Sequence, residues 1–331
     1  MLNPDLKLNT KIFNDDVEQV PIRKGFGEGL ALAGETNKNI VALSADLTES
    51  TQMHFFKNKF PERFVEIGVA EQNLASVASG MSAMGKYPFF SSYAMFSPGR
   101  NWEQIRTTIC YNDRPAVIVG SHAGISVGPD GGTHQAVEDI ALMRVIPRMT
   151  VISPCDSIQA KKATLALSAD PRIAYLRLAR EKTPVITTED TPFEIGKGQV
   201  LYRPEGIAHV AIIATGALVA NALRVAKEFV EKKHIKIIVI NIHTIKPLDE
   251  DLVIKVAKEA KAIVTVEEHQ IAGGLGSAVA ECLAKNSPTP IEFVGVQDVF
   301  GQSGTPLELI EHYGMGRDGI SSAVEKVLGR K

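Results

Sequence analysis

Features that would direct a chain to a membrane, a secretory route or nucleic acid are missing from these 331 residues. The longest apolar stretch, residues 210–223, is interrupted by Gly216 and Asn221 and falls short of the roughly 20 residues of a transmembrane helix. Residues 1–20 mix charges with isolated apolar residues, so we expect no signal peptide there. A formal net charge of −2 predicts no binding surface for nucleic acid or for an anionic membrane.

Cysteine is scarce as well. Cys110, Cys155 and Cys282 lie far apart and have no spacing typical of a metal site or a redox motif. The sequence therefore favours a reducing, cytoplasmic compartment. What is present, 44% hydrophobic and 22% charged residues, is typical of a globular enzyme or enzyme subunit, and the length allows two domains.

A dinucleotide-binding motif is also lacking, although two glycine clusters imitate one. The first cluster comprises Gly25, Gly27 and Gly29. This cluster precedes any strong strand, whereas a phosphate-binding loop follows a strand. The second does not fit G-x-G-x-x-G and follows two acidic residues, Glu267 and Glu268; it comprises Gly273, Gly274 and Gly276. We expect close packing at the first cluster and no cofactor at the second, so a dehydrogenase is the weakest candidate.

Strand and helix patterns alternate along the chain, which predicts parallel sheets covered by helices and ligands at the carboxyl ends of the strands. Strands are expected at residues 39–47, 64–69, 87–93, 116–120, 149–156, 173–178, 210–215, 236–242, 262–269 and 291–296. The pattern loosens over residues 180–207, where proline and threonine gather. We therefore predict two doubly wound α/β domains: residues 1–190, built on a mainly parallel sheet, and a smaller domain of residues 191–331.

Glu71 stands where an apolar segment changes from strand to helix periodicity. Phe64, Val65, Ile67 and Val69 are expected to form a buried strand, and the residues after Glu71 an amphipathic helix. A carboxylate in a first helical turn is favoured by the helix dipole, so one hypothesis is that Glu71 caps this helix. The other is that it is a functional acid.

Residues 121–135 form a long turn with four glycines and one proline. It carries three titratable side chains, His122, Asp130 and His134, which makes it a candidate site. A metal site is conceivable there, but the spacing matches no regular set of ligands, and we predict no metal ligands in this chain.

Three segments resemble, in order and spacing, the pyrimidine-binding domain of transketolases, the thiamine diphosphate enzymes of sugar phosphate metabolism. They are GVAEQN at 68–73, YPFFSSY at 87–93 and HAGISVGPDGGTHQ at 122–135. The resemblance extends over most of the chain through SADLTES at 44–50, RLAREKTP at 177–184 and EEHQIAGGLGSAVAE at 267–281.

The resemblance implies roles for individual residues. Glu71 matches the glutamate that hydrogen-bonds the cofactor's aminopyrimidine ring, a role that suits a buried carboxyl group because burial favours its protonated form. The other cofactor-binding positions are Asp46 and the aromatic residues Tyr87, Phe90 and Tyr93, with Phe90 expected to stack on the ring. His122 and His134 match residues that carry protons at the reacting carbons. Asp130 matches a residue that binds a substrate hydroxyl, and the sugar phosphate positions match Arg23, Ser50 and Arg180.

The GDG motif of the domain that binds the cofactor's diphosphate through magnesium is missing. Pro129-Asp130-Gly131 and Arg317-Asp318-Gly319 are the nearest approximations, and both are in the wrong place. The resemblance then implies a split enzyme, in which this chain is the C-terminal subunit and another chain binds the diphosphate and Mg²⁺. Family assembly implies an α2β2 heterotetramer with active sites at the interfaces.

The activity implied is transfer of a two-carbon ketol unit from a ketose phosphate to an aldose phosphate. A synthase of the deoxyxylulose phosphate type is an alternative, although His122 argues against it. A non-catalytic partner subunit is a second alternative, against which the intact set of Glu71, His122, Asp130 and His134 weighs.

Overall fold

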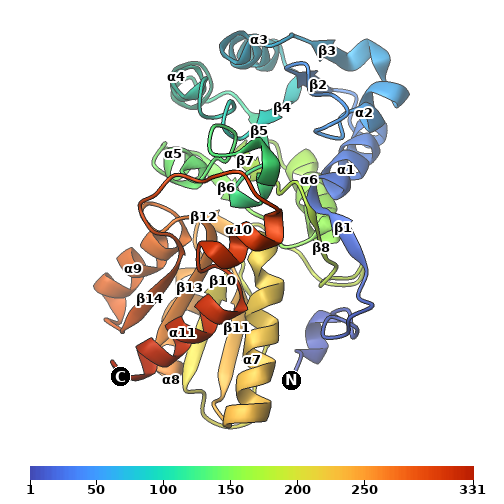
Figure 1. Ribbon diagram of the computed structural model, residues 1–331. Helices are drawn as coiled ribbons and strands as arrows, with labels where there is room; N and C mark the ends of the chain where they lie inside the picture. Colours follow the sequence, from blue (N-terminus) through green and yellow to red (C-terminus); the bar gives the residue numbers. More distant parts are fainter.

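The computed structural model describes residues 1–331 as two α/β units stacked one on the other (Figure 1). The first unit, blue to green, is built on a seven-stranded sheet of order β12-β6-β7-β5-β4-β2-β3. The second unit, yellow to red, contains a five-stranded sheet of order β14-β13-β10-β11-β9. The predicted fold class, a mainly parallel α/β domain followed by a smaller α/β domain, is confirmed.

In the first unit, neighbouring strands pair in parallel except at β12, and the central strands are buried on both faces, which explains their nearly continuous apolar sequences. The strands are β2 (Ile40–Ser44), β3 (Phe64–Glu66), β4 (Tyr87–Tyr93), β5 (Ala116–Ser121), β6 (Thr150–Ile152) and β7 (Ile173–Arg177). The helices are α1 (Ile22–Thr36), α2 (His54–Lys59), α3 (Glu71–Ala83), α4 (Trp102–Gln104) with the π-helix Ile105–Tyr111, α5 (Asp139–Arg144) and α6 (Ser157–Ala169).

In the second unit, only the edge strand β9 runs antiparallel to its neighbour. The strands are β9 (Gln199–Tyr202), β10 (Val210–Ala214), β11 (Ile237–Asn241), β13 (Ile263–Gln270) and β14 (Ile291–Val296). The helices are α7 (Val219–Lys233), α8 (Glu250–Ala260), α9 (Leu275–Asn286), α10 (Pro306–His312) and α11 (Arg317–Leu328). None of the helices in the structure combines the length and apolar composition that crossing a membrane requires.

Each unit contributes a segment that packs in the other unit. Strand β12 (Thr244–Lys246) belongs by sequence to the second unit but pairs with β6 of the first. In the other direction, the N-terminus lies beside α7 in Figure 1, and Leu8, Ile12 and Val17 join the apolar cluster of the second unit. Strands β1 (Gln19–Pro21) and β8 (Lys182–Pro184) form a short antiparallel pair. A division between residues 190 and 191 therefore does not separate all contacts of the two units.

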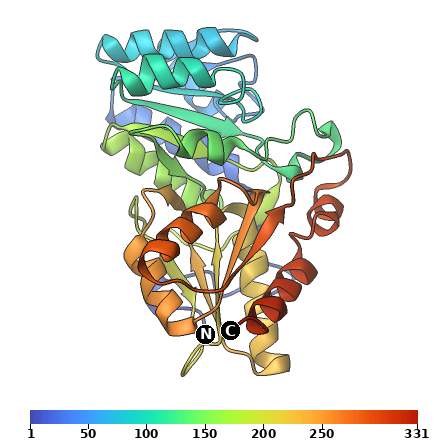
Figure 2. The ribbon, with the colours of Figure 1, turned by 90° about the vertical axis from the view of Figure 1, so that its left-hand side faces the viewer.

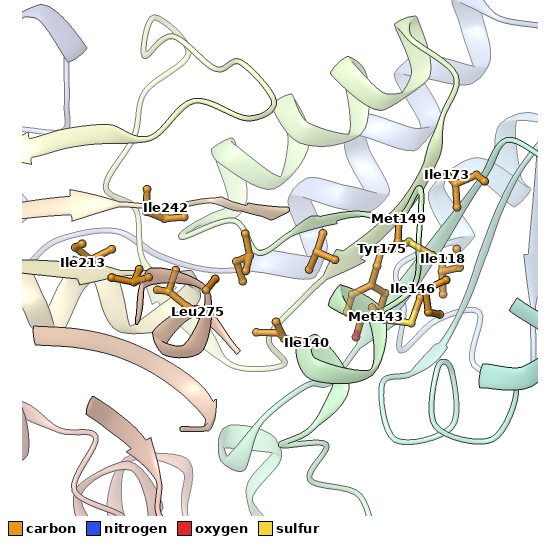
Figure 3. Packing of buried hydrophobic residues seen from close by; sticks show 14 of the residues in the cluster. Ile118, Ile140, Met143, Ile146, Met149, Ile173, Tyr175, Ile213, Ile242 and Leu275 are labelled. Atoms are coloured by element: carbon orange, nitrogen blue, oxygen red, sulfur yellow. The ribbon is translucent and has the colours of Figure 1, made fainter. Parts of the chain in front are cut away.

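One hydrophobic cluster of 36 buried residues runs through both units. Figure 3 shows it extending from Ile213, Ile242 and Leu275 of the second unit to Ile118 and Tyr175 of the first, with Ile140 between them. The domain junction is thus apolar core rather than a solvated hinge.

The glycines that imitate nucleotide loops have structural roles. A Cβ on Gly25 would lie 1.7 Å from the Ser157 carbonyl oxygen, because α1 packs closely on α6, and this confirms the expectation of close packing. In the second cluster, the Glu267 carboxylate accepts the N–H groups of Leu275 and Gly276, both at 2.7 Å. A carboxylate of the chain itself therefore stands at the helix N-terminus where a pyrophosphate would bind.

The predicted buried strand at 64–69 was wrong in its length and in its burial. The strand ends at Glu66 and lies at the edge of the sheet, so Phe64, Val65 and Ile67 are only half-buried, and Val69 is 73% exposed. Gly68, with φ of 78°, turns the chain out of the sheet before α3 begins. The three cysteines are free and buried.

Candidate active site

The candidate residues gather at the carboxyl ends of the parallel strands of the first unit. The segments that follow β2, β4, β5 and β7 meet at this edge of the sheet. Parallel strands place these segments side by side although they are far apart in the sequence. They carry Asp46 and Ser50 after β2, Tyr93 at the end of β4, the glycine loop after β5, and Arg180 after β7.

His122 is buried at the end of β5 and stacks on Tyr93, with ring centroids 3.9 Å apart. Its Nε2 lies 3.3 Å from Arg23 Nη1, and its Nδ1 lies 2.9 Å from Ser121 Oγ. Burial, and secondly Arg23 and Arg180, lower the pKa of His122 to about 3. Because a guanidinium can only donate, the unprotonated nitrogen is Nε2, and the proton resides on Nδ1.

Arg23 and Arg180 place two positive charges near His122. Arg23 Nη1 donates to the Ser50 carbonyl oxygen at 2.6 Å, so Ser50 contacts Arg23 through its backbone rather than its hydroxyl. The buried Nε of Arg23 has no partner, and burial followed by the charge of Arg180 lowers the Arg23 pKa. Arg180 donates to the Val127 carbonyl at 2.5 Å and lies 3.7 Å from the Asp130 carboxylate. Free donors on two guanidiniums suit a phosphate.

Glu71 begins α3, and its side chain does not cap the helix. The residue is 2% exposed, and its carboxylate accepts a hydrogen bond of 2.7 Å from Arg100 but none from a helix N–H group. The Arg100 side chain is itself 51% exposed. Glu71 therefore makes no capping hydrogen bond, although it lies in the first turn of α3, where the helix dipole favours an acid.

Phe96 connects the two sides of the site, and the sequence analysis missed it. The guanidinium of Arg100 lies over its ring at 4.8 Å, His134 meets the ring edge-on at 5.4 Å, and Tyr93 stacks beside it at 6.4 Å. A continuous set of contacts thus runs from Glu71 through Phe96 to His122 and Arg23. Phe96 follows Tyr93 by three residues, the same spacing that selected Tyr87, Phe90 and Tyr93, so the sequence contained a signal for it. Arg100 was missed as well.

Phe90 and Tyr87 lie outside this set of contacts. Phe90 is completely buried in the middle of β4 and packs in the hydrophobic cluster of Figure 3. Tyr87 begins β4 at the opposite edge of the sheet, where its hydroxyl bonds to the backbone of Arg172. An extended strand of seven residues separates Tyr87 from Tyr93 by about 20 Å. Only Tyr93 and the residues after it reach the carboxyl edge.

The remaining candidates line the same edge. Asp46 is exposed, and its N–H donates to Glu66 Oε1 at 2.7 Å, so Glu66, another residue the sequence analysis did not select, organises this turn. Glu66 also accepts from Thr48 at 3.0 Å. Asp130 and His134 lie on the glycine loop, where His134 Nδ1 is 3.0 Å from Thr133 Oγ1. No group of three His, Cys, Asp or Glu side chains in the structure is arranged to hold a metal ion.

Two family models match the chain: the transketolase pyrimidine-binding domain over residues 18–185 and the transketolase C-terminal domain over residues 196–320. A Methanocaldococcus jannaschii protein described as a transketolase C-terminal section is 44% identical, and the alignment covers 94% of this chain and 97% of that protein. The 6-deoxy-6-sulfo-D-fructose transketolase subunit of a Clostridium strain is 39% identical over 96% of this chain and 98% of its own length. Human transketolase is 33% identical, but the chain spans only 49% of it.

Solved structures agree with this match. A structure described as a split-gene transketolase in an inactive β4 tetramer superposes with a TM-score of 0.86 at 42% identity, covering 94% of this chain and 99% of that one. Transketolase from Campylobacter jejuni superposes with a TM-score of 0.78 at 20% identity, which shows the shared fold, and half of that chain is covered.

Proposed function

The chain belongs to the transketolase family, and from this premise we propose that it is the C-terminal subunit of a two-chain, thiamine-diphosphate-dependent transketolase. The proposed reaction moves a two-carbon ketol unit from a ketose phosphate to an aldose phosphate, as in pentose phosphate metabolism, and the proposed location is the cytoplasm. The observation that carries the proposal is the continuous set of contacts from Glu71 through Phe96 to His122 and Arg23.

The Glu71 end of the site fits the aminopyrimidine half of the cofactor. The buried carboxylate provides a hydrogen-bond acceptor, and the Phe96 and Tyr93 rings, which Arg100 connects to it, provide aromatic surfaces for a planar heterocycle. In this proposal the ring nitrogen replaces the exposed Arg100 as the partner of Glu71. When bound, thiamine diphosphate supplies the nucleophilic thiazolium carbon, a group that no side chain provides.

The His122 end fits a sugar phosphate. The neutral imidazole of His122 accepts at Nε2, where it could receive a proton or a hydroxyl hydrogen bond. His134, which meets the Phe96 ring edge-on, is the proposed second proton carrier. Arg23 and Arg180 bind the phosphate, with Ser50 holding Arg23, and Asp130 orients a hydroxyl group.

A second chain is proposed to supply the diphosphate and Mg²⁺ site, in an α2β2 heterotetramer. Two relatives support this arrangement: the M. jannaschii protein is described as a C-terminal section, and the split-gene β4 tetramer is described as inactive. The match to only one half of human transketolase agrees with it.

The decisive experiment mixes this chain with a candidate diphosphate-binding chain, thiamine diphosphate and Mg²⁺, and measures transfer from xylulose 5-phosphate to ribose 5-phosphate. Turnover is expected only with both chains. Related subunits are named for apulose 4-phosphate and for 6-deoxy-6-sulfo-D-fructose, so a panel of donors should include these sugars. Turnover by this chain alone would contradict the split-subunit proposal.

Glu71→Ala in the mixed enzyme tests the role of the carboxylate. Loss of the acid should lower kcat by about 10²–10⁴-fold, the usual contribution of a positioned proton-transfer group. The matched control is Glu62→Ala, which removes an acid with a 68% exposed side chain from the segment before β3 and should leave kcat unchanged. A near-normal kcat in Glu71→Ala excludes the proposed role.

A further inference from the structure

The glycine loop, residues 122–135, has little regular structure with which to hold its functional side chains. Its one helical segment, the 3₁₀ turn Ile125–Asp130, is interrupted at Gly128, where φ is 81°. A backbone of this kind has many accessible conformations, and restricting it to one costs about 1–2 kcal/mol per residue. Contacts from outside the loop must therefore position His122, Asp130 and His134.

Some of those contacts come from the first unit, such as the Arg180–Val127 hydrogen bond, and others come from the second unit. Figure 2 shows the green loop beside the red segment that precedes α10. Gln135 Nε2 donates to the Gln302 carbonyl at 2.9 Å. The Ser126 N–H donates to Glu268 Oε1 at 2.6 Å. A Cβ on Gly124 would lie 2.3 Å from the same oxygen, so the carboxylate occupies the space beside the loop backbone.

Glu268 is itself firmly anchored. It belongs to β13, is 3% exposed, and its carbonyl accepts a 2.8 Å hydrogen bond from Arg177 of β7. Arg177 is paired in turn with Asp139 at 2.8 Å, and Tyr175 donates to Asp139 at 2.7 Å. Buried groups with this many hydrogen bonds form a rigid support, because moving one of them leaves others unsatisfied.

Ser126 and Glu268 also line a cavity of about 570 Å³ between the two units. Packing is incomplete where this space adjoins the loop, so the hydrogen bond adds a positional restraint to the close backbone contacts that Gly124 and Gly132 make with the second unit.

We propose that Glu268 is a positioning residue for the reaction: through the Ser126 N–H, the C-terminal domain holds the glycine loop in the conformation that places His122, Asp130 and His134 in the site. The catalytic consequence rests on the proposed function, whereas the structural consequence does not. The C-terminal domain then has a direct part in arranging the active site.

Hydrogen exchange of the full chain tests the structural consequence. Glu268→Asp keeps the charge but withdraws the carboxylate by about 1.5 Å, one bond length, which breaks the hydrogen bond. Glu268→Gln keeps an acceptor oxygen at the original reach. Amides of residues 122–135 should exchange at least about tenfold faster in Glu268→Asp, and considerably less so in Glu268→Gln.

The matched control is Glu292→Asp. Glu292 is 8% exposed on β14 of the same sheet and pairs with Lys326 and Arg330, away from the loop. Its replacement should leave the loop amides unchanged. Unchanged exchange of these amides in Glu268→Asp would overturn the proposal, as would equal acceleration in Glu292→Asp.

Activity of the two-chain enzyme provides the second readout. Glu268→Asp should lower kcat/KM for the sugar about tenfold or more while leaving the affinity for thiamine diphosphate unchanged, and Glu268→Gln should recover most of the activity. If hydrogen exchange of the loop amides increases in Glu268→Asp but kcat/KM does not change, the proposed catalytic consequence is wrong. An absence of turnover in the wild-type mixture would count against the proposed function, while the exchange result would still decide the structural part.

Discussion

His122 shows how surroundings select one protonation state of a single residue. Burial and two nearby arginines favour the neutral imidazole, and the hydrogen bonds leave its acceptor nitrogen facing Arg23. A neutral histidine can accept a proton from a substrate hydroxyl, which an imidazolium cannot do. The pKa shift therefore supports a neutral, hydrogen-bonding imidazole rather than a permanent cation at this position.

The same shift makes stability depend on pH. The folded-state pKa of about 3 is below the ordinary value of 6.5, so in acid the unfolded chain binds a proton that the folded chain does not. The contribution is complete above about pH 6.5 and is lost as the pH falls towards 3. Each pH unit in this window removes about 1.4 kcal/mol.

His122→Gln should remove that dependence. Urea unfolding between about pH 4 and 5.5 should show a slope of unfolding free energy against pH that is smaller than in the wild type by roughly 1.3 kcal/mol per unit. Equal slopes in the two proteins would show that His122 titrates normally in the folded state.

At the scale of single elements, helix α1 depends on glycine for its contact with α6. Gly25 allows the two backbones to approach, whereas Gly80 lies on the exposed face of α3 with nothing within 4 Å of an added Cβ. Replacement of glycine by alanine should therefore change the free energy of unfolding in opposite directions in α1 and α3.

Gly25→Ala should lower the free energy of unfolding by about 1–3 kcal/mol or more, because the methyl group overlaps the Ser157 carbonyl. Gly80→Ala should raise it by about 0.5–1 kcal/mol, since alanine restricts the unfolded chain and favours helix. Urea denaturation of both variants measures the difference. A loss of stability in Gly80→Ala as large as that in Gly25→Ala would contradict the packing argument.

Strand β4 explains why two of the predicted aromatic contacts do not reach the site. Successive side chains of a strand point to opposite faces, so Phe89 and Phe90 enter separate apolar clusters on the two sides of the sheet. Only the end of the strand opens onto the ligand edge. The sequence predicted the bounds of β4 correctly, but aromatic spacing alone did not distinguish residues within the strand from those beyond it.

For the whole molecule, we expect the two units to unfold together, because each unit contributes a segment to the other and one core runs through both. The N-terminal residues Leu8, Ile12 and Val17 pack in the second unit, β12 extends the sheet of the first, and the cluster of Figure 3 crosses the junction. Separating the units would expose this apolar surface and break the Arg177–Glu268 hydrogen bond.

Differential scanning calorimetry of the full chain should therefore show one transition with equal calorimetric and van't Hoff enthalpies. Separate expression of residues 1–190 and 191–331 should produce fragments without a cooperative transition. Two well-separated transitions in the full chain would show that the units are independent and would weaken the role proposed for the junction.

The sequence by itself determined the main strands and helices in their order along the chain, the two α/β units, the glycine loop and the family, because periodicity, turn residues and motifs are local properties of the chain. It also singled out Glu71, His122 and Arg23, which the fold brings to one edge of a sheet. Only the tertiary structure decided that Phe96 contacts Tyr93, His134 and Arg100 while Phe90 is buried in the core, and that Arg100 pairs with Glu71. It alone placed Glu268 against Ser126, since contacts between residues distant in sequence arise from how the elements pack.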